Sequence, residues 1–289
     1  MNKNILITGS GGLIGHELID QLKGNNTIWA VGRNDNFTGE KNVHHIPLDL
    51  AADWSASSLP ENIDVIYHLA QSEHFREFPD MALDVFRVNT LSTMKLLDYA
   101  HKTKVKKFIY ASSGGIYGFG DTGFTEEDEI AAHGDLGFYI GTKLCSEILV
   151  ENYFKHFDIN IIRFFFVYGP RQRKTMLIPR LIANIKEGKT VQLQGPEGIR
   201  VNPVYVTDAA NALIKCMEVA GSHKINIGGK EVITLKQLCE IIGESVGTKP
   251  AFDINDKVEP KNIYGDISRM TRLLGEPGIS IREGIKKML

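Results

Sequence analysis

Cysteine is scarce in this chain of 289 residues, which contains only three. Cys145, Cys216 and Cys239 form neither a CxxC pair nor a spacing typical of metal ligands, so we expect reduced core thiols and no metal site. Long apolar runs are also lacking, because none approaches the ~20 residues that a membrane span needs. A candidate strand already begins at Asn4 and leaves no room for a leader peptide. We therefore expect a soluble, cytoplasmic protein.

An excess of charge of one sign is absent as well. The chain has 33 Lys and Arg against 35 Asp and Glu, a net charge of -2. This balance gives no overall field for nucleic acid or an anionic membrane, so neither is expected as a partner. What the chain does have is 43% hydrophobic residues. That content and the length are sufficient for one large core and a smaller lobe.

Short apolar runs alternate with segments of helical periodicity through the first two-thirds of the chain. Strands are expected at residues 4–8, 27–31, 65–69, 107–112 and 159–166. Helices are expected at residues 13–22, 82–100 and 139–154. This alternation predicts an α/β fold, a doubly wound parallel sheet with helices on both faces. The strands are apolar throughout, as is typical of strands buried on both faces.

The alternation becomes irregular after about Phe166, where proline and glycine separate short elements. We expect a nucleotide-binding domain over residues 1–166. Residues 167–289 are expected to form mainly a smaller, partly interleaved substrate lobe, with some segments returning to the first domain. Within this lobe, a helix is predicted at residues 235–246, with Thr234 as its N-cap.

Glycines cluster directly after the first expected strand. Gly9, Gly12 and Gly15 form a GxxGxxG turn, and the helix that follows begins with Leu13 and Ile14. In such a turn one glycine permits the tight bend, one lets the backbone approach a pyrophosphate, and one packs the helix on the strand. The helix N-terminus offers free N–H groups to the anion. The context predicts a Rossmann-type dinucleotide site formed by these five residues.

The end of the second strand bears on which dinucleotide binds. An acidic residue there usually binds the ribose 2′-hydroxyl of NAD, whereas a nearby arginine accepts the 2′-phosphate of NADP. Here Gly32 stands where the carboxylate would be, and Arg33 follows it. Because a guanidinium suits a phosphate, the sequence favours NADP over NAD. The alternative is that Arg33 is a solvated surface residue.

A tyrosine and a lysine stand four residues apart in the third expected helix. Tyr139 and Lys143 would share one helix face. A nearby ammonium lowers the pKa of a phenol from about 10, so Tyr139 could exchange a proton with a hydroxyl as hydride moves. Ser112 and Ser113 fall at the carboxyl end of an expected strand, where open α/β sheets bind ligands. An ordinary exposed helix pair is the alternative interpretation.

Together these motifs resemble the extended short-chain dehydrogenases of the NAD-dependent epimerase/dehydratase family, which includes UDP-galactose 4-epimerase and sugar-nucleotide reductases. The resemblance extends over nearly the whole chain and also rests on residues 47–50, 64–70, 88–90, 163–170 and 226–228. It implies that Ser113 binds the reacting sugar oxygen and that Tyr139 is the general acid/base. Lys143 would hold the cofactor ribose and lower the pKa of Tyr139.

The resemblance implies further cofactor contacts. Asp49 and Leu50 would lie near the adenine, Leu69 and Ala70 along the cofactor, and Asn89 in the supporting hydrogen-bond network. Without the resemblance, Asp49, His68 and Asn89 would be interpreted as a capping group, a core histidine and a helix cap. A homodimer through the helices at 82–100 and 139–154 is also expected from the resemblance.

Two departures from the family pattern narrow the reaction. Family dehydratases have an Asp-Glu pair after the catalytic hydroxyl residue, and the GDP-fucose-synthase branch has a cysteine two positions after it. This chain has Gly114 and Gly115, which cannot transfer protons. We expect a ketoreductase or dehydrogenase acting at C4 of a nucleotide-linked sugar, because Arg33 favours NADP. The alternatives are a 4-epimerase with tightly bound NAD and, more remotely, a non-enzymatic NADP sensor.

The expected substrate residues also depart from the pattern. Phe166 stands where many family members have an asparagine that contacts the substrate diphosphate, and the expected arginine appears one residue early, as Arg200. Either Arg200 still reaches a diphosphate, or the basic loop with Arg171, Arg173 and Lys174 replaces it, or the substrate has no diphosphate. A solvated basic loop is the alternative. His133 would border the substrate or lie on the surface.

Overall fold

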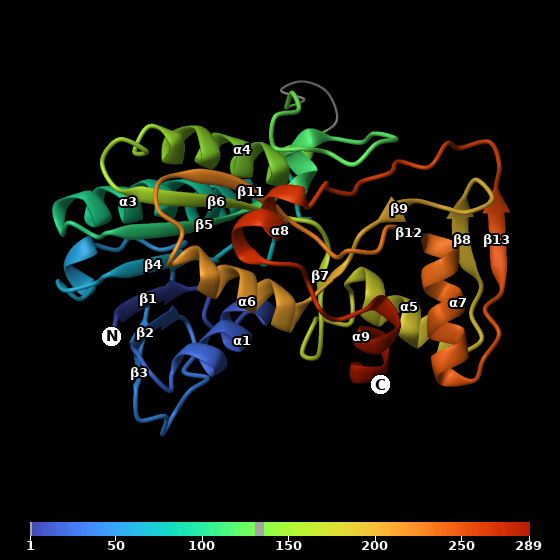
Figure 1. Cartoon of the computed structure of the whole chain (residues 1–289), viewed down its shortest axis with the longest axis horizontal. Helices are drawn as coiled ribbons and strands as arrows, with labels where there is room; N and C mark the ends of the chain where they lie inside the picture. Colours follow the sequence, from blue (N-terminus) through green and yellow to red (C-terminus); the bar gives the residue numbers. More distant parts are fainter. Residues whose placement is uncertain (1, 131–135) are drawn as a thin grey trace.

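A seven-stranded parallel sheet forms the centre of the computed structural model, which describes residues 2–130 and 136–289 (Figure 1). The strand order is β11-β6-β5-β4-β1-β2-β3, and every adjacent pair is parallel. The strands are β1 (Asn4–Thr8), β2 (Thr27–Gly32), β3 (Val43–Pro47), β4 (Val65–His68), β5 (Lys107–Ser113), β6 (Asp158–Phe164) and β11 (His223–Ile227). The predicted α/β fold is therefore confirmed.

Helices cover both faces of the sheet, as Figure 1 shows. On one face α1 (Leu13–Leu22), α6 (Val206–Cys216) and α8 (Ser268–Leu274) form an apolar core with Ile5 and Ile7 of β1. On the other face α3 (Ser92–Lys102) and α4 (Gly137–Glu151) pack with Leu6 and its neighbours. Successive residues of β1 thus enter opposite cores, which is why the middle of the strand is apolar without alternation.

The helix expected at residues 82–100 is not continuous. The structure has α2 (Ala82–Phe86), a π-helical turn (Arg87–Leu91) and then α3. A π-helical turn shifts the register of the backbone hydrogen bonds, and side chains bond carbonyls beside it. Ser92 Oγ donates to the Val88 carbonyl, and Thr93 Oγ1 donates to the Asn89 carbonyl at 2.7 Å. Apolar periodicity alone gives no sign of this local change.

The strand expected at residues 159–166 ends earlier, at Phe164. Phe166 has a φ of 50°, in the left-handed region, and this residue turns the chain out of the central sheet. The next element, β7 (Val167–Tyr168), pairs instead with β10 (Val204–Tyr205). The turn at Phe166 thus leads the chain toward the second lobe.

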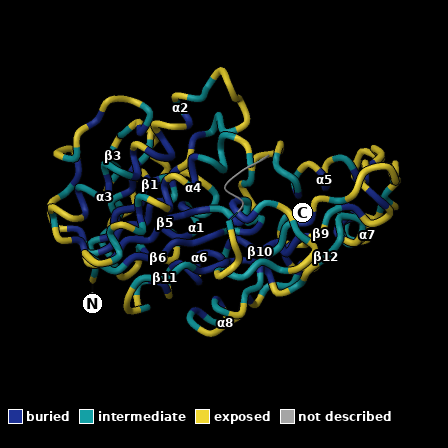
Figure 2. The backbone as a smooth tube through the Cα atoms, turned by 90° about the horizontal axis from the view of Figure 1, so that it is seen from above, coloured by how far each residue is buried: buried dark blue, intermediate teal, exposed yellow. Residues whose placement is uncertain are grey.

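The second lobe lies beside the sheet (Figure 2) and has its own apolar core. It contains α5 (Leu177–Lys186), α7 (Leu235–Val246), α9 (Ile281–Lys287), β8 (Val191–Gln194) paired with β13 (Phe252–Asn255), and β9 (Arg200–Val201) paired with β12 (Ile233–Thr234). Thr234 caps α7 as predicted, in a capping box with Gln237. From the same part of the chain, β11 returns to the central sheet beside β6.

Cys216 and Cys239 are buried, whereas Cys145 is exposed on α4. The expectation of three core thiols was therefore wrong for Cys145, because its position on α4 faces away from the sheet core.

No helix in residues 2–130 and 136–289 has the length and apolar character to cross a membrane. Within the same residues, no group of three or more His, Cys, Asp or Glu side chains could hold a metal ion.

Candidate active site

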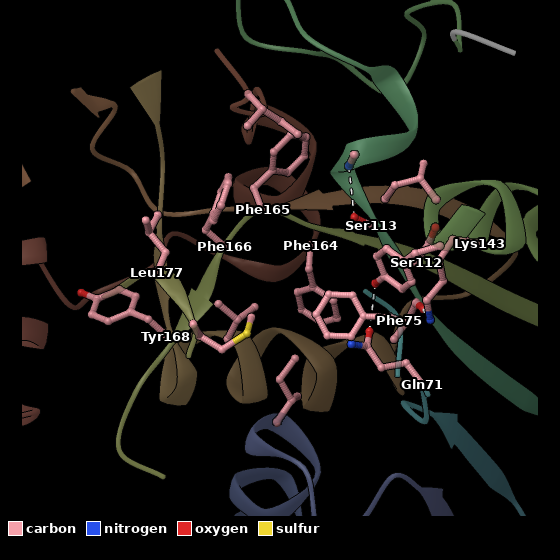
Figure 3. A pocket seen from close by; sticks show the side chains of 18 of the residues that line it. Gln71, Phe75, Ser112, Ser113, Lys143, Phe164, Phe165, Phe166, Tyr168 and Leu177 are labelled. Carbon is pink, nitrogen blue, oxygen red and sulfur yellow. Dashed lines mark hydrogen bonds between the residues drawn. The ribbon is translucent and has the colours of Figure 1, made fainter. Parts of the chain in front are cut away.

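A pocket of about 450 Å³ lies between the carboxyl ends of β4, β5 and β6 and the start of α5 (Figure 3). Open α/β sheets bind their ligands at this edge. Residues singled out from the sequence line the pocket, among them Ile14, Leu69, Ser112, Ser113, Tyr139, Lys143 and Phe166. The fold thus brings the serine, tyrosine and lysine, which lie on two different elements, to one cavity.

Ser113 is the last residue of β5 and caps the short 3-10 helix Gly114–Tyr117. Its Oγ accepts a hydrogen bond from the Gly115 N–H at 3.1 Å, so the hydroxyl hydrogen remains free to donate to a ligand. A Cβ at Gly115 would lie 2.6 Å from Ile140 Cδ1, and one at Gly114 would meet the Phe165 ring. The two glycines therefore permit close packing around Ser113.

Tyr139 is held by a residue that the sequence did not single out. Its hydroxyl donates to Gln71 Oε1 at 2.9 Å, and its ring centroid lies 5.2 Å from that of Phe75. Burial raises the pKa of Tyr139 above its usual value. The expected lowering by Lys143 is not found, because the ammonium of Lys143 is directed elsewhere. The signal that could have indicated Gln71 was its place two residues after Leu69, in the loop that follows β4.

Lys143 is 2% exposed, and its Nζ donates to the Ala111 carbonyl of β5 at 2.8 Å. The Tyr110 ring centroid lies 5.3 Å from the same nitrogen. Burial lowers the pKa of Lys143 to about 8. The ammonium is thus fixed at the pocket by a backbone acceptor.

Replacing Lys143 by methionine should change how stability depends on pH. Between pH ~8 and ~10.5 the unfolded chain keeps the lysine proton and the folded chain releases it, so wild-type stability rises with pH in this window. We expect the wild type to gain about 3 kcal/mol relative to Lys143→Met from pH 7 to pH 10.5. Urea unfolding of both proteins across this range measures the difference, and parallel curves would refute the assignment.

Asn89 fastens α4 to the loop that follows β4. Its Nδ2 donates to Thr142 Oγ1 at 3.0 Å, and its Oδ1 accepts from the Ser72 N–H at 3.0 Å. Ser146 Oγ also donates to the Asn89 carbonyl at 2.9 Å. Thr142 and Ser146 lie on the same helix as Tyr139 and Lys143, so these bonds fix the helix that carries both.

A buried ion pair joins the same helix to β6. Arg163 of β6 binds Glu147 of α4, with Nη2 2.7 Å from Oε2, and their side chains are 1% and 0% exposed. Arg163 Nη1 also donates to the Tyr117 hydroxyl at 2.6 Å, which in turn donates to Asn226 Oδ1 at 2.9 Å. One buried polar network thus joins β6, α4, the 3-10 helix and β11.

The glycine turn has the shape of a phosphate cradle. Gly9 has a φ of 71°, and a Cβ there would lie 2.8 Å from the Ala70 nitrogen. A Cβ at Gly15 would strike the Gly9 carbonyl oxygen. Gly12 is the N-cap of α1 and offers no side chain to its first N–H groups, including those of Leu13 and Ile14. These N–H groups therefore fit the pyrophosphate of a dinucleotide.

A family model described as the NAD dependent epimerase/dehydratase family matches residues 5–228. The chain belongs to this family. A UDP-glucuronate 4-epimerase of Thermodesulfobacterium geofontis is 32% identical over 78% of this chain and 71% of its own length. UDP-glucuronic acid decarboxylase 3 of Arabidopsis thaliana is 28% identical over 99% of this chain and 88% of its own length.

Among solved structures, the UDP-glucuronic acid 4-epimerase of Bacillus cereus, in complex with UDP-glucuronic acid and NAD, has a TM-score of 0.86. It is 28% identical and is matched over 98% of this chain and 97% of its own length. The expectation that this chain is an enzyme of the epimerase/dehydratase family is thereby confirmed, whereas the preference for NADP receives no support.

Arg33 has a partner in this epimerase/dehydratase family member. Its guanidinium lies 2.7 Å from Glu73 Oε1, and this carboxylate raises the pKa of Arg33 more than the charges of Asp49 and Asp84 do. The preference for NADP assumed a free guanidinium. The preference loses its support because the guanidinium is paired with Glu73. Local spacing gives no sign of this contact, because Glu73 is 40 residues from Arg33.

Three residues expected along the cofactor have local structural roles. Asp49 Oδ1 accepts from the Ala51 N–H at 2.9 Å, as a capping group does, and Leu50 packs in the core. Ala70 is buried beside Gly9.

His68 is a core histidine, with Nδ1 2.7 Å from Thr8 Oγ1, and burial lowers its pKa to about 3.

Besides Ser113, Phe166 is the expected substrate residue that lines the pocket. Arg171 is directed toward α1, with Nη1 2.9 Å from His16 Nδ1. Arg200 is exposed on β9 whereas Val201 is buried, and a one-residue shift along a strand moves a side chain to the opposite face. His133 lies outside the described residues. Lys143 and Arg76 bring cationic groups to the pocket wall.

Proposed function

We propose that this protein is a 4-epimerase that oxidises and then reduces C4 of a nucleotide-linked sugar with a retained NAD. The observation that carries the proposal is the convergence of Ser113, Tyr139 and Lys143 on one pocket beside the glycine turn. Gly114 and Gly115 add no second acid or base, so the chemistry requires only proton exchange and hydride transfer at one carbon.

In this proposal Ser113 donates a hydrogen bond to the C4 oxygen, and Tyr139 accepts the proton of the C4 hydroxyl through a phenolate. When bound, NAD supplies the acceptor and later the donor of the hydride. Lys143 is fixed by the Ala111 carbonyl in the same pocket, and its positive charge together with that of bound NAD would stabilise the phenolate against the rise in pKa that burial causes. Tyr139 returns its proton to the oxygen when the opposite face of C4 is reduced.

The lining of the pocket suits a ketone that must present both faces. Aromatic and aliphatic side chains dominate it, and they include Phe75, Phe119, Phe165, Phe166 and Leu177. Apolar walls form few directional hydrogen bonds, so they allow a sugar ring to turn while Ser113 and Tyr139 keep the C4 oxygen in place. A nucleotide-linked substrate is supported by the UDP-sugars bound in solved relatives.

NAD rather than NADP is proposed because the Arg33 guanidinium, which could bind the 2′-phosphate of NADP, is already paired with Glu73. The glycines of the turn, together with Leu13 and Ile14, would hold the pyrophosphate. Asp49, Leu50, Leu69 and Ala70 would lie along the rest of the cofactor. A ketoreductase is the second candidate, because Ser113, Tyr139 and Lys143 line the same pocket and would also serve a single hydride transfer at C4.

The first experiment is to denature the purified protein and identify any released dinucleotide by mass spectrometry. In parallel, UDP-sugars are incubated with the protein, and C4 epimers are detected by NMR without added cofactor. A 4-epimerase should release about one NAD per chain and interconvert epimers. Net consumption of added NADPH with a keto sugar would favour the ketoreductase. Failure to bind either dinucleotide would refute both.

We also propose a homodimer formed through α2 and α4. Leu83 and Phe86 on α2 and Ile148 on α4 are exposed by 71%, 44% and 56%. Large apolar side chains exposed on neighbouring helices are typical of an interface. Light scattering should therefore give twice the mass of one chain, and a monomer at micromolar concentration would contradict the proposal.

A further inference from the structure

Three charged side chains form a bridge, which we call the Arg33–Glu73–Arg173 bridge. Glu73 Oε1 lies 2.7 Å from Arg33 Nη2, and Glu73 Oε2 lies 3.0 Å from Arg173 Nη2. Glu73 stands in the loop after β4, Arg33 follows β2, and Arg173 lies between β7 and α5. The bridge thus joins the segments that follow β2 and β4, the two neighbours of β1, to the segment between β7 and α5.

The strand order places this bridge across the dinucleotide site. β1 lies between β2 and β4, and the glycine turn begins at the carboxyl end of β1. The bond from Arg33 to Glu73 therefore connects the loops on either side of that turn. Arg33 is the cation that follows β2, where a 2′-phosphate would be recognised.

We propose that Glu73 makes this site selective for NAD over NADP by holding the Arg33 guanidinium. This inference rests on the proposed function only in requiring that the glycine turn binds a dinucleotide. The carboxylate of Glu73, 2.7 Å from Arg33 Nη2, neutralises the charge that would attract a 2′-phosphate and repels a second anion. Arg173 binds the other carboxylate oxygen and so keeps Glu73 in place.

Other negative charges act in the same direction. The carboxylates of Asp49 and Asp84 lie close enough to contribute to the raised pKa of Arg33. A 2′-phosphate beside Arg33 would thus add to negative charge that is already there. The 2′-hydroxyl of NAD carries no charge and avoids this repulsion, while it can still bond to a carboxylate oxygen.

The test is the affinity of the full chain, freed of bound dinucleotide, for NADH and NADPH, titrated by their fluorescence. Glu73→Gln keeps the size of the side chain and removes its charge. We expect the variant to bind NADPH about ten-fold more tightly and NADH within two-fold of the wild type. The bridge is exposed, and exposed ion pairs contribute little to stability, so the variant should fold with an unchanged Tm.

Two controls separate Glu73 from a general change of charge. Glu77→Gln removes the same charge four residues later, where the carboxylate pairs with His74 Nδ1 at 3.0 Å, and it should change neither affinity. Glu73→Gln combined with Arg33→Ala should lose the gain for NADPH. A parallel change in both affinities, or no change in Glu73→Gln, would overturn the role of Glu73 alone. No binding of either dinucleotide by the wild type would overturn the proposed function too.

Discussion

Tyr139→Phe is expected to lower kcat by at least about 10³-fold while NAD binding stays within two-fold of the wild type. The substitution removes only the hydroxyl that bonds to Gln71 in this structure and would exchange a proton with the C4 oxygen. The phenyl ring keeps its packing against Phe75, so the pocket should hold its shape. Epimer interconversion followed by NMR and NADH titration measure the two effects separately.

A matched control is Tyr153→Phe, which removes one hydroxyl just after α4 and outside the pocket lining. It should turn over at the wild-type rate. If Tyr139→Phe kept a tenth or more of the wild-type kcat, Tyr139 would not be the acid/base. If the wild type itself showed no turnover of any UDP-sugar, while both variants bound NAD equally, a sensor would be the better interpretation.

The strands inside the central sheet could be predicted from the sequence, whereas the strands at its edges could not. β1, β2, β4, β5 and β6 lie inside the sheet, covered on both faces, so most of their residues are apolar, although β6 also contains Asn160 and Arg163. The two strands missed from the sequence are β3 and β11, which form the two edges. An edge strand is half exposed and tolerates polar residues, so it has no apolar run to detect.

In the candidate site, too, contacts between residues near each other in sequence could be predicted, and contacts between distant residues could not. Tyr139 and Lys143 are four residues apart, so helical geometry alone predicts that they share one face of a helix. Gln71 reaches Tyr139 from 68 residues away, and Glu73 meets Arg33 between two loops. No periodicity encodes such contacts, which depend on strand order. The interpretation of Arg33 failed for this reason.

The buried network around Arg163 should have the largest effect on stability. Arg163→Met leaves the Glu147 carboxylate without a partner at 0% exposure and removes one donor to the Tyr117 hydroxyl. We expect the free energy of unfolding to fall by about 3–5 kcal/mol, because an uncompensated buried charge is costly. Urea denaturation followed by circular dichroism measures this loss. Activity should fall as well, because Glu147 lies one turn after Lys143 on α4.

The double variant Arg163→Met with Glu147→Leu distinguishes the unpaired charge from lost packing. Both partners of the ion pair then become apolar, neither leaves an unpaired charge, and Tyr117 keeps its bond to Asn226. Replacing both members of a buried pair is often close to neutral, so most of the stability lost in Arg163→Met should return. A double variant as unstable as the single one would show that the guanidinium acts by filling space. Recovered stability without recovered turnover would show that the ion pair positions α4 for catalysis.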